Sequence, residues 1–225
     1  MSDVKVWNKD NLIAKSKYRH FPTDMMLRAV FSDNYFNSHK LKTDGVVLDI
    51  GCLYANNLVP FSDRGWKLYG TEVTEESVEV AKIQCEANNL NAEIKLGFNT
   101  ELPFQSDKFD VLLSIATIHY EETITDVDKA LKEMCRVMRD CGCAVITTVA
   151  PKHYIFKSSK KIGEHLYQLN MESDLRHLQK FIFFENADDF ILIANKYFSE
   201  VEVARCTETY PNKCVDIWLF KLKKN

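Results

Sequence analysis

Two acidic residues at the ends of apolar segments are the side chains of this sequence best placed to do chemistry. Asp49 lies near the end of the run 46–50 and is followed by Gly51, and Glu72 ends the run 67–72, 23 residues after Asp49. An acid at the end of the second strand of a βαβ unit is where a ribose diol is usually bound. The pair predicts a nucleoside-containing ligand at the carboxyl ends of a parallel sheet. The alternatives are a turn-capping Asp49 and an exposed Glu72 at a helix start.

The elements that must position these acids alternate along the chain. Apolar runs predict strands over 46–50, 67–72, 92–96, 109–115 and 143–149. Apolar spacings of three and four residues and capping residues predict helices that begin near residues 23, 56, 74, 125 and 186. Two further strands, 201–206 and 215–222, are separated by a short link and predict an antiparallel hairpin. This alternation predicts a doubly wound α/β sheet, with the loops after the strands at one edge.

The composition is that of one globular domain. The chain has 225 residues, of which 46% are hydrophobic and 27% charged, and its net charge is −3. No basic excess indicates nucleic acid, no segment is long and apolar enough to span a bilayer, and the N-terminus has no apolar signal core. The seven cysteines are an odd number without the spacing of a zinc site, so we expect reduced thiols, no metal and a cytoplasmic protein.

Four motifs, in order, resemble the class I S-adenosylmethionine-dependent methyltransferases, in particular the branch that acts on small molecules. They are VLDIGC at 47–52, YGTEVTEES at 69–77, LPF at 102–104 followed by DKFDVLLS at 107–114, and ALKEMCRVM at 130–138. The resemblance implies a Rossmann-like seven-stranded sheet with an antiparallel last strand. It also implies S-adenosylmethionine as the cofactor and methyl transfer to an oxygen or nitrogen atom of a small molecule. The chain departs from the family at Leu53 and Ala55, where glycines are usual and allow a positive φ.

The resemblance also assigns roles to residues at the strand ends. His119 becomes a candidate general base and Tyr120 a substrate-facing aromatic residue, with a buried structural histidine as an equal alternative. Structural packing remains an alternative for most of the other positions. The residues expected to bind the cofactor are Asp49, Gly51, Cys52, Glu72, Val73, Phe98, Asn99, Thr100, Ser114 and Ile115.

The single domain, 1–225, is expected to have four parts. They are an N-terminal cover at 1–44, a cofactor-binding core at 45–150, a lid or substrate insertion at 151–184, and a C-terminal helix and hairpin at 185–225. The lid contains a basic and aromatic cluster that could receive an anionic substrate, although a solvated lysine-rich loop is the favoured interpretation. This cluster consists of Lys152, His153, Tyr154, Lys157, Lys160, Lys161 and His165. We expect a small-molecule substrate and neither a nucleic-acid nor a membrane partner; the oligomeric state stays open.

Two other function classes compete with a methyltransferase. Leu53 and Ala55 favour a catalytically inactive, methyltransferase-like binding or partner subunit whose glycine turn has decayed. A nicotinamide-dependent dehydrogenase is weaker, because no G-x-G-x-x-G follows the first strand.

Overall fold

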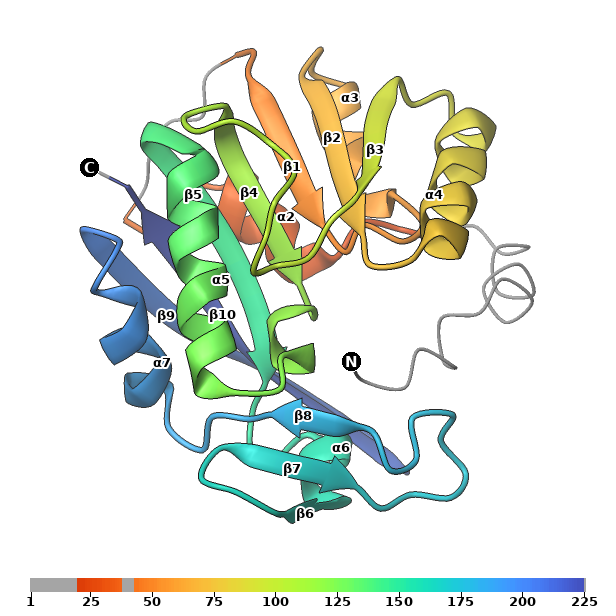
Figure 1. Cartoon of the computed structure of the whole chain (residues 1–225), viewed down its shortest axis with the longest axis vertical. Coiled ribbons are helices and arrows are strands. Elements are labelled where there is room, and N and C mark those ends of the chain that lie inside the picture. The colour runs from red at the N-terminus through yellow and green to blue at the C-terminus, as the bar shows by residue number, and fades with distance from the viewer. Residues whose placement is uncertain (1–19, 38–42, 225) are drawn as a thin grey trace.

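The computed structural model describes residues 20–37 and 43–224, which form one seven-stranded sheet with helices on both faces (Figure 1). Six strands run parallel and β10 is antiparallel to both of its neighbours. This topology confirms the predicted α/β class and the reversed last strand. The order across the sheet is β3 (Ala92–Leu96), β2 (Lys67–Glu72), β1 (Val46–Ile50), β4 (Phe109–Ile115), β5 (Met138–Val149), β10 (Lys213–Lys223) and β9 (Glu200–Tyr210).

Two apolar cores lie on the two faces of this sheet. One packs α5 (Ile124–Val137) and α7 (Ala187–Ala194) against the strands, and Figure 1 shows these helices in front of the sheet. The other packs α2 (Asp24–Phe31), α3 (Val59–Ser62) and α4 (Glu75–Ala87). Strands such as β1, buried along their whole length, are apolar on both faces because helices cover both.

Local capping chemistry fixes where the helices begin. Thr74 caps α4 as predicted, because its hydroxyl accepts the Ser77 N–H and the Ser77 hydroxyl accepts the Thr74 N–H. α5 begins at Ile124, close to the predicted start near residue 125, because the Thr123 hydroxyl accepts the Asp126 N–H. The helix expected from residue 56 is a 3₁₀ turn, η2 (Asn56–Leu58), followed by the short α3.

The strand predicted to start at Cys143 begins five residues earlier. β5 starts at Met138, opposite Phe109, and the register then shifts so that Val111 pairs with Cys143. Gly142 allows this irregularity, since a Cβ atom there would lie 2.8 Å from the carbonyl oxygen of Arg139. Residues that look like a helix stop therefore belong to a strand with a bulge.

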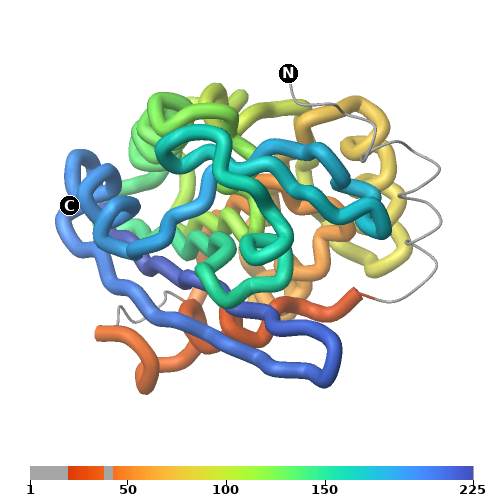
Figure 2. The backbone as a smooth tube through the Cα atoms, turned by 90° about the horizontal axis from the view of Figure 1, so that it is seen from below, coloured from red at the N-terminus to blue at the C-terminus, as the bar shows by residue number. Residues whose placement is uncertain are grey.

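The insertion at 151–184 has regular structure of its own, although its sequence shows no clear periodicity. It contains α6 (Tyr154–Lys157) and an antiparallel sheet of β6 (Ser159–Lys161), β7 (Leu166–Leu169) and β8 (Lys180–Ile182). Figure 1 shows this lid beyond the carboxyl ends of β4 and β5, and Figure 2 shows it crossing the same edge of the molecule. Residues 1–19 and 38–42 of the predicted N-terminal cover lie outside the described part.

Candidate functional site at the carboxyl ends of the strands

The turn after β1 keeps a glycine-like path without the usual glycines. Gly51 has a φ of +67°, and Leu53 and Ala55 also have positive φ values of 43° and 52°. The N–H groups of Gly51 and Cys52 both donate to the carbonyl of Thr71, which ties the turn to β2. A left-handed conformation costs about 1–2 kcal/mol for a residue with a Cβ atom. Leu53 and Ala55 therefore keep the positive φ values that glycines usually provide in this family, at the cost of backbone strain.

Two glycines allow close contacts around this turn. A Cβ atom on Gly51 would lie 2.5 Å from Cγ2 of Thr117, which follows β4. A Cβ atom on Gly70 would lie 2.6 Å from the sulfur of Cys52, so Cys52 is buried against β2. Small residues thus bring the ends of β1, β2 and β4 together, as the predicted site requires.

Asp49 is buried at this junction with an unsatisfied oxygen. Among the described residues, its Oδ2 atom has no hydrogen-bond partner. Burial, followed by repulsion from Glu72, raises the pKa of Asp49 to about 8, although a hydrogen bond with the Asn57 side chain acts in the opposite direction. A carboxyl group that only capped the turn would have both of its buried oxygens hydrogen-bonded. The unsatisfied oxygen of Asp49 can receive a cationic group.

Glu72 is also buried, at the end of β2. Its Oε1 atom accepts the Leu53 N–H at 2.5 Å, and Ser77 and the Val73 main chain also bond to its carboxylate. Burial raises the pKa of Glu72 even though these hydrogen bonds lower it. The structural alternative of an exposed acid at a helix start is therefore wrong.

Apolar side chains flank Glu72 on the surface. Val73 is 42% exposed and Phe98 is 49% exposed, and the N–H of Gly97 donates to the Glu72 carbonyl at 2.9 Å. The ends of β2 and β3 therefore present two solvent-accessible apolar groups next to a buried acid. Thr100 is half-buried in the same turn, where Glu101 donates its N–H back to Phe98.

Asn99 connects this region to a residue that the sequence did not single out. Its amide donates to Oε1 of Glu121 at 2.7 Å, and burial raises the pKa of Glu121. The one feature of the sequence that could have pointed to Glu121 is its position directly after Tyr120. The contact joins the turn after β3 to the segment after β4.

The end of β4 is tied to its neighbours by small hydroxyl groups. The Ser114 and Thr117 hydroxyls lie 2.6 Å apart, and the Ala116 N–H donates to the Thr147 hydroxyl at 2.9 Å. Ser114 is buried and Ile115 is half-buried. These contacts form the floor between the turn after β1 and the lid.

His119 and Tyr120 lie in the 3₁₀ turn η3 (Ile118–Tyr120), under the lid. The His119 ring is buried, with its centroid 4.7 Å from that of Tyr120 and 5.7 Å from that of Phe181. Its Nδ1 atom has no partner within the described residues. Burial, followed by the charges of Arg176 and His153, lowers the pKa of His119 to about 3. The imidazole is therefore neutral and a weak base, which favours the role of a buried structural histidine over that of a general base.

The lid lysines face solvent and not the strand ends. Lys161 pairs with Glu185 at 2.7 Å on the surface, and Lys152, Lys157 and Lys160 are exposed. This arrangement fits the solvated-loop interpretation. The tip of the β9–β10 hairpin reaches the lid, where Lys213 lies 4.0 Å from the centre of the Tyr154 ring.

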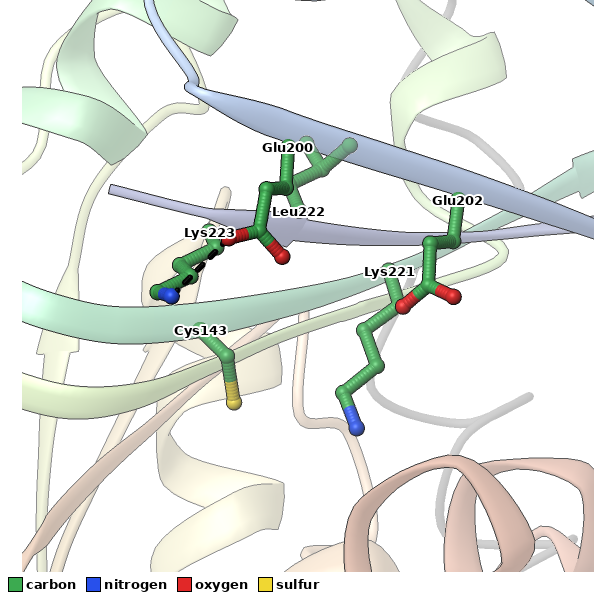
Figure 3. A pocket seen from close by; sticks show the side chains of 6 residues that line it. All are labelled: Cys143, Glu200, Glu202, Lys221, Leu222 and Lys223. Atoms are coloured by element: carbon green, nitrogen blue, oxygen red, sulfur yellow. Dashed lines mark hydrogen bonds and ion pairs between the residues drawn. The ribbon is translucent and has the colours of Figure 1, made fainter. Parts of the chain in front are cut away.

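A small hollow elsewhere on the sheet does not belong to this site (Figure 3). It is lined by Cys143, Glu200, Glu202, Lys221, Leu222 and Lys223, with an ion pair of 2.9 Å between Glu200 and Lys223. The candidate site lies at the carboxyl end of β5, whereas Cys143 lies towards its amino end. Within the described residues no group of acids, cysteines and histidines could hold a metal ion, and no helix is long and apolar enough to cross a membrane.

Comparisons with known proteins find similar sequences and similar folds. A family model described as "Methyltransferase domain" matches residues 48–146. The ubiquinone biosynthesis O-methyltransferase of Pelagibacter ubique is 29% identical over 112 residues, which are 49% of this chain and 45% of that protein. The match therefore spans less than half of the length of this curated relative.

Solved structures share the fold over most of the chain. A SAM-dependent methyltransferase from Methanosarcina mazei has a TM-score of 0.64 at 16% identity and is matched over 82% of this chain and 94% of its own. The N-methyltransferase NodS of Bradyrhizobium japonicum, solved with S-adenosyl-L-homocysteine, has a TM-score of 0.60 at 15% identity, over 89% and 84% of the two chains. Residues 48–146 therefore match a methyltransferase domain, and the chain shares the fold of solved S-adenosylmethionine-dependent methyltransferases.

Proposed function

We propose that this protein transfers a methyl group from S-adenosylmethionine to an oxygen or nitrogen atom of a small molecule. The observation that carries the proposal is the buried pair of Asp49 and Glu72 beside a positive-φ turn, with one Asp49 oxygen unsatisfied. A nucleoside that also carries an ammonium group fits such a pair, since it offers a diol to one acid and a cation to the other.

Each part of the cofactor has a matching group in the chain. Glu72 would accept hydrogen bonds from the ribose diol, Val73 and Phe98 would cover the faces of the adenine ring, and Asp49 would compensate the ammonium charge. Ser114 and Ile115 would lie beneath the reacting centre. The cofactor supplies an activated methyl group on sulfur, and the protein's part is binding, alignment and exclusion of water.

The acceptor atom must approach the methyl carbon in line with its bond to sulfur, from a distance of about 3–3.5 Å. The lid covers this space largely with aromatic rings, and the His119 imidazole among them is neutral near neutral pH. An acceptor atom with an available lone pair needs no strong base, so the low basicity of His119 is compatible with methyl transfer. The matched proteins include some named O- and N-methyltransferases, which supports both acceptor atoms, beside one named a sterol 4-C-methyltransferase.

The same proposal places the protein in the cytoplasm. All seven cysteines are free thiols, and Cys52, Cys85 and Cys143 are buried. Free thiols persist in a reducing compartment.

Calorimetric titration with S-adenosylmethionine and with NAD tests the proposal. We expect the sulfonium nucleoside to bind and NAD not to bind. Glu72→Ala should weaken binding by about 1.5–3 kcal/mol, the scale of hydrogen bonds to a charged group. Glu76→Ala is the matched control, because Glu76 is an exposed acid four residues away and should leave the affinity unchanged. Equal affinities of wild type and Glu72→Ala would refute the ribose assignment.

A second candidate is a catalytically inactive binding subunit. The strained Leu53 and Ala55 favour it, because a turn that has lost its glycines need no longer receive a cofactor. This candidate predicts that neither nucleoside binds, so the same titration separates the two functions.

A further inference from the structure

Arg176 is a cation that reaches under the lid, on the loop between β7 and β8. Its side chain is 21% exposed and that of its partner Asp174 is 14% exposed. The other ion pair on the lid, between Lys161 and Glu185, has exposures of 52% and 57%. A largely buried ion pair stabilises a fold weakly, because desolvation offsets most of the attraction. Its place under the lid therefore points to a role other than stability.

The hydrogen bonds of the Arg176 guanidinium leave donor capacity unused. Its Nε and Nη2 atoms donate to the two Asp174 oxygens at 2.8 and 2.7 Å, and Nη2 also donates to the Tyr154 hydroxyl at 3.1 Å. The Tyr120 hydroxyl is a further partner. A guanidinium has five N–H groups. Within the described part of the chain, these contacts account for four at most, so at least one N–H on Nη1 remains.

The hydrogen bond with Tyr120 connects the Arg176 guanidinium to the segment that follows β4. Tyr120 follows the end of β4 by five residues, and it belongs to the turn that the floor of the site leads into. The Tyr154 and Tyr120 hydroxyls contact the guanidinium, and both rings pack against the apolar core of the lid. A molecule bound beside Tyr120 would therefore meet aromatic rings and the guanidinium together.

We propose that Arg176 is the specificity-determining residue for the methyl acceptor, through an Nη1 N–H that binds an oxygen atom on a planar ring. The inference rests on the proposed function and names its substrate class. A guanidinium only donates, so its partner must be an acceptor atom such as a hydroxyl or carbonyl oxygen. Asp174 already balances the charge of Arg176, which favours a neutral oxygen over a carboxylate or phosphate. The aromatic wall favours a flat ring.

Two fluorinated probes test the inference by fluorine NMR, on protein saturated with S-adenosylhomocysteine. Fluorocatechol carries hydroxyl oxygens on its ring, and fluorobenzene carries none. We expect wild type to bind fluorocatechol at least about tenfold more tightly than fluorobenzene, the scale of a hydrogen bond to a charged donor. Arg176→Lys keeps the charge but loses the planar fork, and it should remove most of this difference. Lys161→Met, on the outer face of the same lid, should preserve it.

The outcomes separate the two proposals. If S-adenosylhomocysteine does not bind, the proposed function fails and this inference fails with it. If the nucleoside binds but wild type does not distinguish the two probes, the inference alone is overturned; this comparison needs no variant to fold. If Arg176→Lys weakened the affinity for both probes by equal factors, Arg176 would serve lid packing only. That result would also overturn the inference. Tyr120→Phe is a second variant. It should weaken the affinity for fluorocatechol, but not for fluorobenzene, by a smaller factor than Arg176→Lys does.

Discussion

The Glu72 carboxylate accepts the main-chain N–H of Leu53, so the acid that ends β2 also holds the turn that follows β1. One carboxylate therefore serves both the shape of the turn and the proposed ribose site. A loss of affinity in a Glu72 variant can then come from a loosened turn or from a lost ligand contact, and two substitutions are needed to separate them.

Glu72→Ala and Glu72→Gln should differ in stability. Alanine leaves the Leu53 N–H without its partner, and a buried unsatisfied donor costs about 1–3 kcal/mol of unfolding free energy. The amide oxygen of glutamine can still accept that N–H, so Glu72→Gln should stay close to wild type. Denaturant unfolding at fixed pH measures both, and equal destabilisation by the two substitutions would contradict the role of Glu72 in the turn.

Ala55→Gly should stabilise the protein, although glycine usually weakens a fold. Ala55 has a φ of 52°, which costs a residue with a Cβ atom more than it costs glycine. We expect a gain of about 0.5–1 kcal/mol after the entropy of glycine in the unfolded chain is included. Ala81→Gly is the control, because Ala81 is equally buried but lies inside α4, where glycine should cost about 1 kcal/mol. A loss of stability in Ala55→Gly would show that the turn is not strained.

The sequence was enough to place Asp49 and Glu72, because topology brings them together. β1, β2, β3 and β4 have the predicted bounds. The central strands β1 and β4 are buried along almost their whole length, so their sequences are largely apolar and easily recognised. Once the strands are parallel, the residues that follow them must share one edge. The start of β5 was missed because residues 139–142 carry the composition of a turn, while tertiary pairing keeps them in a strand.

The structure of the lid and the role of Arg176 could not be predicted from the sequence in this way. The lid strands β6, β7 and β8 are three or four residues long, too short for a periodic pattern to show. Arg176 contacts Tyr154, 22 residues earlier, and Tyr120 in η3, so no local spacing connects the three. The exposed lysines were conspicuous as a cluster, whereas Arg176 is a single, partly buried residue whose role depends on the fold.

Binding of S-adenosylmethionine should release a proton from Asp49. Burial raises the pKa of this carboxyl to about 8, so it holds a proton near neutral pH, and an approaching ammonium group favours the charged form. Affinity should therefore rise with pH up to about 8. In calorimetric titrations the observed enthalpy should be more favourable in Tris than in phosphate, because the buffer takes up the proton. Asp49→Asn should abolish this dependence, and a buffer-independent enthalpy in wild type would contradict the assignment.

Acid should destabilise the fold through two histidines at the lid. Burial, followed by neighbouring positive charges, lowers the pKa of His119 to about 3 and that of His153 to about 4, from 6.5. The unfolded chain then binds more protons than the folded chain between these values, so stability is lost as the pH falls below about 6.5, by up to about 1.4 kcal/mol per pH unit and histidine.

The double variant His119→Phe, His153→Asn should flatten this dependence. Phenylalanine suits the aromatic surroundings of His119, and the asparagine oxygen can replace Nδ1 of His153, which accepts the Ile155 N–H at the start of α6. Because Asp49 titrates in both proteins, the difference between their unfolding free energies isolates the histidines. We expect this difference to grow in favour of the variant as the pH falls from about 7 to about 5. A difference that does not change with pH would show that both rings are protonated alike in the folded and unfolded chains.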